Sequence, residues 1–215
     1  MKIALIAVAV LILLAVAGML VFVYVVQNVE QPTYSVVERD GAFEVRDYQA
    51  LVVAEVTRQG SRGKGLSAGF GPLARYIFAK ERGGERIAMT APVVQQAAAE
   101  DERIAMTAPV TQTRTADGTW AVSFIMPARY RLADLPAPAG SDVKLREVPP
   151  RRVAAVRFSG RTTDAAIAEQ EQRLRDWMAR RGLTPAAPPI YAYYNDPFTP
   201  GFLRRNEVMI EVDRN

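Results

Sequence analysis

The first part of the chain is one long apolar run. From Ile3 to Val26 every residue is apolar or glycine, apart from the amphipathic Tyr24. As an α-helix, this run of about 24 residues would be roughly 36 Å long, which exceeds the ~30 Å hydrocarbon core of a bilayer. The pattern predicts that residues 1–26 form a transmembrane anchor.

The charges around this run predict its orientation. Lys2 and the chain amine precede it, whereas Asn28 and Glu30 follow it. Positive charge on the N-terminal side favours an N-terminus in the cytoplasm. We therefore expect a single-pass protein of the inner (cytoplasmic) membrane with a periplasmic domain. Ala15-Val16-Ala17 leaves a cleaved signal peptide as the alternative. The apolar run continues without a break beyond Ala17, which favours retention of the helix.

Beyond a linker at residues 27–33, the pattern changes to runs typical of β-strands. We assign residues 34–215 to one folded domain, which is long enough to bury a core. The runs TYSVVERD and AFEVRDY flank Asp40-Gly41, a residue pair typical of a hairpin turn. The run ALVVAEVTR follows, and a glycine-rich stretch at Gly60–Gly65 ends it.

A first helix is predicted over roughly 66–80. Its apolar residues recur at spacings of four, three and four, which places them on one helical face. They are Leu66, Phe70, Leu73 and Ile77. Glycines weaken the first turns, so we expect firm helix only from about Pro72, because proline is tolerated at the first helical position.

A second helix is predicted in TTDAAIAEQEQRLRDWMARRG. Thr162 or Thr163 is suited to cap its start, and Gly182 is suited to end it. Its buried stripe is predicted to consist of Ile167, Leu174, Trp177 and Met178. Strand-like runs precede and follow each helix, so the pattern indicates a pseudo-duplicated α+β domain with a curved sheet, antiparallel or mixed, and two helices packed against it.

One nine-residue phrase, ERIAMTAPV, occurs twice, at Glu85–Val93 and Glu102–Val110. The short spacing predicts an antiparallel hairpin of the two copies, with Gln96–Glu102 as its connection. Pro92 and Pro109 each lack a backbone donor, so we expect a sheet edge or bulge there. Thr90 and Thr107 are expected to donate to the carbonyls that this frees.

The composition excludes several chemistries. The 215 residues include no Cys and no His, which removes disulfides, thiolate sites, imidazole ligands and the usual Ser-His-Asp and zinc-hydrolase machineries. The formal net charge of +4 suits anionic lipids or ligand carboxylates. No basic run with interleaved aromatics is present, so the sequence does not indicate nucleic-acid binding.

Six ordered phrases between Tyr34 and Val212 resemble the SOUL/heme-binding family. They are YSVVERDGAFEVRDY, GFGPLARYIFAKE, RIAMTAPV, FIMP, RRVAAVRFSGR and YAYYNDPFTPGFLRRNEVMIEV. The resemblance implies a distorted β-barrel of two βαββ-like halves with a helix packed on each. It also implies binding of heme or another tetrapyrrole, which makes heme the candidate cofactor.

The sequence departs from the pattern of those family members that use a His as heme ligand. Only binding through an apolar groove and cationic contacts remains open, unless Tyr76 or Met89 ligates the iron. For both residues, ordinary core packing is the alternative. We predict no metal site of the protein's own.

A porphyrin needs apolar walls and cations for its propionates. The first helix and the late loop offer both. The candidate ligand-binding residues are Arg62, Lys64, Leu66, Phe70, Leu73, Tyr76, Ile77, Phe198, Phe202 and Arg204. For the helix stripe the alternative is plain core, and for Arg204-Arg205-Asn206-Glu207 it is a structural cluster that pins the DPFTPGF loop.

Two other function classes compete with tetrapyrrole binding. One is a module for another flat hydrophobic ligand or a regulatory partner, because a fold does not fix a ligand. The other is an enzyme that uses Glu55 or Glu207 with Tyr193 as acid and base. No spacing pairs those residues, so the sequence predicts a binding protein and not an enzyme.

Overall fold

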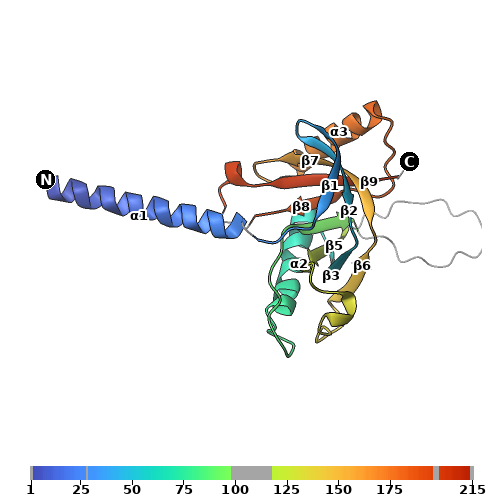
Figure 1. Ribbon diagram of the computed structural model, residues 1–215, viewed down its shortest axis with the longest axis horizontal. Helices are drawn as coiled ribbons and strands as arrows, with labels where there is room; N and C mark the ends of the chain where they lie inside the picture. The colour runs from blue at the N-terminus through green and yellow to red at the C-terminus, as the bar shows by residue number, and fades with distance from the viewer. Residues whose placement is uncertain (1, 28, 98–117, 196–198, 214–215) are drawn as a thin grey trace, which may run out of the picture.

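The computed structural model describes residues 2–27, 29–97, 118–195 and 199–213. In chain order the elements are α1 (Lys2–Gln27), β1 (Tyr34–Asp40), β2 (Phe43–Tyr48), β3 (Leu51–Gln59), α2 (Arg62–Ile77), β4 (Val93–Ala97), β5 (Thr119–Ile125), η1 (Leu132–Asp134), β6 (Lys144–Val148), β7 (Arg151–Phe158), α3 (Asp164–Arg180), β8 (Ile190–Tyr193), η2 (Gly201–Leu203) and β9 (Asn206–Val212). Figure 1 shows a β domain with α1 extending away from it. The α+β class predicted from the sequence is confirmed.

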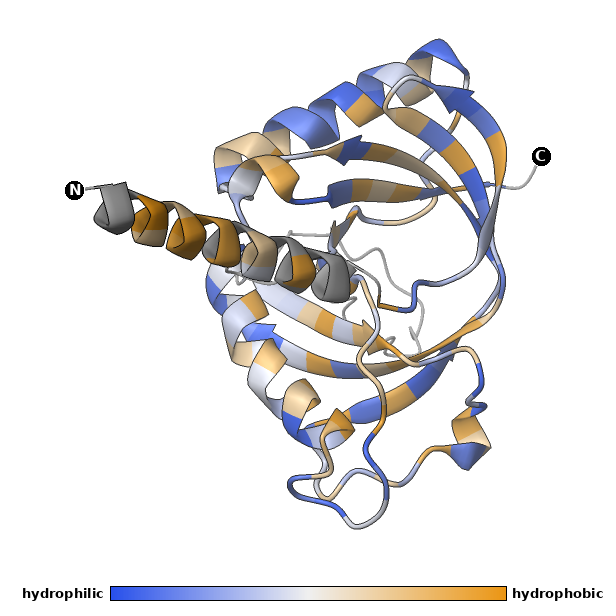
Figure 2. Cartoon of the chain, turned by 60° about the vertical axis from the view of Figure 1, so that its left-hand side comes forward, coloured by the Kyte–Doolittle hydropathy of each residue, from blue (hydrophilic) through white to orange (hydrophobic). Residues whose placement is uncertain are grey.

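The strands form one curled sheet. Its nine strands follow the order β1-β2-β7-β9-β8-β4-β5-β3-β6, and every neighbouring pair is antiparallel. β1 and β6 are the two edges, so the distorted β-barrel that the resemblance implied is an open half-barrel. Helices α2 and α3 lie on the outer side of the curl (Figure 2).

The sheet contains two matching βαββ units. In the first, β3 leads through α2 to β4 and β5, and in the second, β7 leads through α3 to β8 and β9. In each unit the last strand lies between the other two: β5 lies between β4 and β3, and β9 lies between β7 and β8. The units meet where β4 pairs with β8, with Gln95 opposite Tyr191. A pseudo-twofold axis therefore passes between these two strands.

The sequence predicted firm helix only from about Pro72. Helix α2 in fact begins at Arg62, about ten residues earlier. Ser61 caps it by accepting a hydrogen bond from the Lys64 N–H. The glycines that weaken its propensity allow close packing, because a Cβ on Gly69 would lie 2.7 Å from Val122 Cβ. Pro72 lies inside the helix and deprives the Ala68 carbonyl of its helical donor. Arg58 Nε donates to that carbonyl at 3.3 Å.

Helix α3 agrees with its prediction. Thr163 caps it by accepting from the Ala166 N–H at 3.2 Å, and Gly182 follows it with a positive φ of 67°. The predicted stripe of Ile167, Leu174, Trp177 and Met178 is fully buried against β7 and β9. A hairpin between β1 and β2 is confirmed, but its two loop residues are Gly41 and Ala42 and not Asp40-Gly41, because Asp40 still pairs with Phe43.

The first copy of the duplicated phrase lies mostly outside the regular strands. Only Val93 of the first copy belongs to a strand, because β4 begins directly after Pro92, which has no donor for a ladder. The sequence predicted that Thr90 would donate to a carbonyl that Pro92 leaves without a donor. Thr90 Oγ1 does donate to a backbone carbonyl, that of Ile125. β4 pairs with β5 on one edge and β8 on the other. The second copy, including Thr107 and Pro109, lies outside the described residues, as does the predicted pairing of the copies.

The apolar N-terminal run forms the 26-residue helix α1. Its described apolar side chains, such as Leu11 and Leu13, are exposed on the helix surface. Across the side chains that the structure describes, no helix reaches the combined length and apolarity needed to cross a membrane. The membrane anchor thus stays a prediction.

Candidate functional site

A groove of about 750 Å³ opens between the N-terminal turns of α2 and α3. It lies at the junction of the two βαββ units, with β5 and β8 contributing its floor. Its lining residues are Gln59, Gly60, Ser61, Arg62, Gly118, Trp120, Asp164, Ile167, Ala168, Glu171 and Tyr191. We call it the interhelix groove. Ligand pockets in proteins typically enclose ~300–1,000 Å³, so its size suits a small organic molecule.

Two aromatic rings form the floor of the interhelix groove. The ring centroids of Trp120 and Tyr191 are 6.1 Å apart, with a tilt of 49°. Trp120 Nε1 donates to the Gly60 carbonyl at 2.9 Å, and the Tyr191 hydroxyl donates to Glu171 Oε2 at 2.9 Å. Both rings are therefore fixed before any ligand arrives, which lowers the entropic cost of binding a flat molecule.

Arg62 locks the two helix N-termini together at one end of the groove. Its guanidinium donates to Asp164 Oδ1 at 3.0 Å, to the Thr162 carbonyl at 2.5 Å and to the Tyr193 hydroxyl at 2.6 Å. The Arg62 side chain is buried, and Gln95 Nε2 donates to its carbonyl at 2.8 Å. Burial raises the pKa of Tyr193, and the Arg62 charge offsets part of that increase. Arg62 thus serves first as a structural clamp.

Two exposed cations flank this clamp. Lys64 lies in the first turn of α2, and Arg161 directly precedes Thr162. Within the described part of the chain, neither side chain forms a hydrogen bond or an ion pair. Neither of them is among the residues that line the interhelix groove.

The predicted stripe on α2 packs toward the sheet. Leu73, Tyr76 and Ile77 are fully buried in a cluster with β3 and β5, and Leu66 packs against that cluster. The Tyr76 hydroxyl donates to the Pro136 carbonyl at 2.9 Å. Of the ten predicted site residues, Arg62 alone is among the groove-lining residues.

The other predicted residues lie elsewhere. Phe70 is exposed on α2 and makes an edge-to-face contact with Phe124, at 5.2 Å between centroids. Phe202 is exposed on η2, and Arg204 Nε donates to the Thr199 carbonyl at 2.8 Å. Phe198 lies outside the described residues. A ligand-binding role for these residues stays a prediction.

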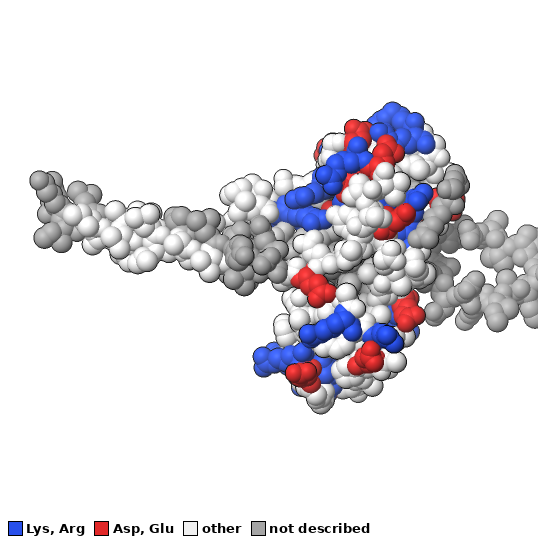
Figure 3. Space-filling model, in the orientation of Figure 1, with Lys and Arg blue, Asp and Glu red and all other residues white. Residues whose placement is uncertain are grey.

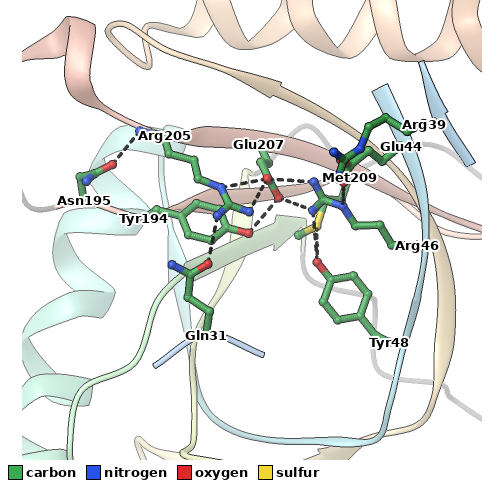
Figure 4. A network of polar contacts seen from close by, with 10 residues as sticks. All are labelled: Gln31, Arg39, Glu44, Arg46, Tyr48, Tyr194, Asn195, Arg205, Glu207 and Met209. Atoms are coloured by element: carbon green, nitrogen blue, oxygen red, sulfur yellow. Dashed lines mark hydrogen bonds and ion pairs between the residues drawn. The ribbon is translucent and has the colours of Figure 1, made fainter. Parts of the chain in front are cut away.

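A second polar cluster lies on the inner face of the half-barrel and is centred on Glu207 (Figure 4). This carboxylate is fully buried and accepts hydrogen bonds from Arg46 at 2.7 and 3.1 Å, from Arg205 at 2.8 and 3.1 Å, and from the Tyr194 hydroxyl at 2.8 Å. Burial by itself raises the pKa of Glu207, but the hydrogen bonds and charges of Arg46 and Arg205 outweigh it, so the pKa is lowered.

The residues around Glu207 also hold the described part of the DPFTPGF loop. This matches the structural alternative that the sequence left open for Arg204-Arg205-Asn206-Glu207. The Arg205 N–H donates to Asn195 Oδ1 at 2.6 Å, and Asn206 Nδ2 donates to the Gly160 carbonyl at 3.2 Å. Arg204 Nε donates to the Thr199 carbonyl within the same segment, and the Gly160 N–H donates to the Gly201 carbonyl at 2.9 Å. These contacts favour the structural alternative for Arg204-Arg205-Asn206-Glu207, and a ligand-binding role for Arg204 stays a prediction.

The residues of the enzyme hypothesis are not assembled into one cleft. Ala192 pairs with Glu207, so the adjacent Tyr193 points to the opposite face of the sheet from Glu207. Glu55 binds Arg146 at 2.7 Å and accepts from the Ser123 hydroxyl at 2.8 Å. Each carboxylate is occupied by a cation, which suits ion pairing better than proton transfer.

The groove fits the ring of a tetrapyrrole better than its iron. A tyrosine ligates heme iron as a phenolate, and burial raises the pKa of both Tyr191 and Tyr76. Both hydroxyls are also occupied, by Glu171 and by the Pro136 carbonyl respectively. Met89, the other candidate ligand, packs against the cluster beneath α2. The residues therefore offer aromatic walls and cations, without a prepared axial ligand.

Sequence reasoning missed the two aromatic residues of the floor. Trp120 and Tyr191 belong to different units and meet only because β4 and β8 join those units. One signal could have identified Tyr191. Side chains alternate between the two faces of a strand, so in IYAYY Tyr191 lies on the same face as Tyr193.

The structure is an open antiparallel half-barrel with two outer helices and an aromatic groove between them. A family model described as SOUL heme-binding protein matches residues 29–211. The chain belongs to the SOUL heme-binding family. No curated protein sequence matches it.

Solved structures share the fold at low sequence identity. The C-terminal domain of EcmrR has a TM-score of 0.56 and 10% identity, and the match covers 85% of this chain and 99% of that one. EcmrR in its DNA complex has a TM-score of 0.56 and 10% identity. That match covers 83% of this chain and 60% of the longer EcmrR chain. A hydrolase from Listeria innocua has a TM-score of 0.52 and 14% identity, and the match covers 82% of this chain and 94% of the hydrolase.

Proposed function

We propose that this protein binds heme or a related tetrapyrrole in the interhelix groove. The observation that carries the proposal is the prearranged pair of Trp120 and Tyr191 on the floor of a groove of about 750 Å³. A porphyrin is a flat apolar plate, and burying it contributes roughly 25 cal/mol per Å² of apolar area. Membership of a heme-binding family supports this ligand class.

The propionates of the ring are assigned to the Arg62 end of the groove. Lys64 and Arg161 are exposed basic residues that are neighbours in the sequence of Arg62 and Thr162. The N-termini of α2 and α3 also meet there, and helix N-termini favour anions. Asp164 already neutralises Arg62, so Lys64 and Arg161 would supply the charge-assisted contacts.

The chain's own residues bind the ring and position its carboxylates, and heme when bound would add a redox-active iron. Ile167 and Ala168 of α3 form an apolar wall that excludes water from one side of the plate. With no His and no Cys in the sequence, recognition rests on the ring and not on the metal. The role that follows is binding, and not catalysis.

The runner-up function is a module for another flat hydrophobic ligand or a regulatory partner. The same aromatic floor favours it, because stacking does not distinguish between flat rings. In that case other flat ligands would raise the melting temperature, and hemin would give no saturable change in its spectrum.

We further propose that α1 anchors the domain in the inner membrane, with the domain on the periplasmic side. The support is the sequence: the run from Ile3 to Val26 is apolar on every side of the helix, and Lys2 precedes it. The bilayer is then a constitutive partner of the protein.

The experiment is a hemin titration of the full chain in detergent, followed by the Soret band, with protein-free micelles as the blank. We expect saturable binding and a loss of tenfold or more in affinity for Trp120→Leu. Phe70→Leu is the matched control, because Phe70 is an exposed aromatic residue on the outer surface of α2. A melting curve for each variant separates binding from folding. Equal affinities for both variants and the wild type would place the ligand outside the interhelix groove.

A further inference from the structure

The linker after α1 is bound to the domain almost as soon as it leaves the helix. The Ala91 N–H donates to the Glu30 carbonyl at 2.9 Å, and the Ala128 N–H donates to Glu30 Oε1 at 2.7 Å. Gln31 Oε1 accepts from Arg205 Nη1 at 3.0 Å. Hence the chain between α1 and the domain is a short tether and not a long flexible one.

This tether fixes which face of the domain lies nearest to the end of α1. Extended chain spans at most ~3.6 Å per residue, so the step from Gln27 to Glu30 covers no more than roughly 11 Å. If α1 spans the bilayer, the surface around Glu30 and Gln31 lies at the headgroups. Arg205 belongs to that surface, because it binds Gln31.

The η2 turn belongs to the same surface. Phe202 lies three residues before Arg205, and Figure 1 shows η2 beside the end of α1, at the start of β9. The Phe202 side chain is 75% exposed, the highest value among the described large hydrophobic residues, and the adjacent Leu203 is 37% exposed. An exposed aromatic residue next to a membrane helix suits the interfacial region of a bilayer.

Basic side chains border the turn. Arg204 and Arg205 follow it directly, and a hydrogen bond from the Gly160 N–H to the Gly201 carbonyl at 2.9 Å brings the exposed Arg161 beside it. Figure 3 shows Lys and Arg atoms next to the point where α1 meets the domain. Basic residues near an anionic membrane surface are attracted to it.

We propose that η2 is a membrane-docking turn, in which Phe202 and Leu203 insert into the bilayer interface. This inference rests on the proposed anchoring by α1. The turn then gives the domain a second contact with the bilayer and fixes its orientation. The Gly160–Asp164 segment connects η2 with Arg62, so the cationic end of the interhelix groove lies close to the membrane.

Depth-dependent quenching tests the proposal on the full chain in vesicles of zwitterionic and anionic lipids, part of them brominated on the acyl chains. Phe202→Trp is the probe. Asp213→Trp is the matched control, because Asp213 is exposed at the opposite end of β9, whose strand rise of ~3.3 Å per residue separates the two positions. Trp120 and Trp177 contribute equally to both variants. We expect brominated lipid to quench Phe202→Trp at least twofold more than the control.

Equal quenching of the two variants would overturn the docking turn. A carbonate wash and vesicle flotation on the same samples test α1 separately, since an anchored chain floats whether or not η2 docks. A chain that floats with equal quenching refutes docking alone, and a chain that fails to float refutes the anchor. Hemin binding in detergent depends on neither result.

Discussion

Arg62 and Asp164 occupy the same position in the two halves of the molecule and bind each other. Each is the first residue of its helix, after the capping residues Ser61 and Thr163, and their ion pair is 2.8 Å long. The pair crosses the pseudo-twofold axis between β4 and β8. It closes one end of the interhelix groove, so groove shape and domain stability depend on the same contact.

Replacing Arg62 by Ala should therefore destabilise the domain by roughly 1–3 kcal/mol, because the half-buried Tyr193 hydroxyl and the Thr162 carbonyl lose their donor. Asp164→Asn should cost much less, because the Asp164 side chain is 76% exposed. Urea unfolding of the full chain in detergent measures both changes. Similar losses for the two variants would contradict the clamp.

The glycines of α2 give a second prediction. Gly69→Ala should destabilise by roughly 1–3 kcal/mol, because its Cβ would lie 2.7 Å from Val122 Cβ. Gly63→Ala is the control in the same helix, since nothing lies within 4 Å of its added Cβ. There the helix propensity of alanine should stabilise by up to about 1 kcal/mol. Thermal melting followed by circular dichroism should give shifts of opposite sign, and a stabilising Gly69→Ala would disprove the close packing.

The lowered pKa of Glu207 makes the stability of the folded domain depend on pH. Its pKa is lowered in the folded protein from an ordinary value of 4.5. A lowered folded pKa contributes stability that is fully present above the unfolded pKa and is lost as pH falls through the folded value. We expect the free energy of unfolding to fall below about pH 4.5, and Glu207→Gln to flatten that part of the profile.

The same substitution should lower stability at neutral pH, because Arg46 and Arg205 would be left without their carboxylate. Breaking a buried pair typically costs roughly 3–5 kcal/mol, which is an upper range here because the amide still accepts a hydrogen bond. Glu38→Gln, which removes an exposed partner of Arg181, should leave the urea midpoint nearly unchanged. An unchanged acid profile in Glu207→Gln would rule out this source of pH dependence.

The elements that could be predicted from the sequence are those whose local signals agree. Helix α3 has a clean apolar period, a capping threonine and a terminal glycine, and all three describe the structure. Helix α2 was predicted to start too late, because glycines that lower helix propensity are required for contact with Trp120 and Val122. That requirement is tertiary and leaves no local trace.

The site was harder to predict than the fold for a related reason. Arg62 was identified because it precedes a helix, but its partners Asp164 and Tyr193 come from the other half of the chain. Leu73 and Ile77 have the period of a binding face, and a core face has the same period. Only the pairing of β4 with β8 reveals which aromatic residues share a groove.

The most direct test of the account compares hemin with iron-free protoporphyrin IX on the full chain in detergent. The interhelix groove offers Trp120 and Tyr191 to the ring, Lys64 and Arg161 are the cations proposed for its propionates, and the sequence has no His or Cys to ligate the iron. We therefore predict dissociation constants within about tenfold of each other, and equal weakening of both ligands in the double variant Lys64→Gln, Arg161→Gln. Hemin binding more than about a hundredfold tighter, or roughly 2.7 kcal/mol at 1.4 per decade, would contradict the account by requiring an iron ligand.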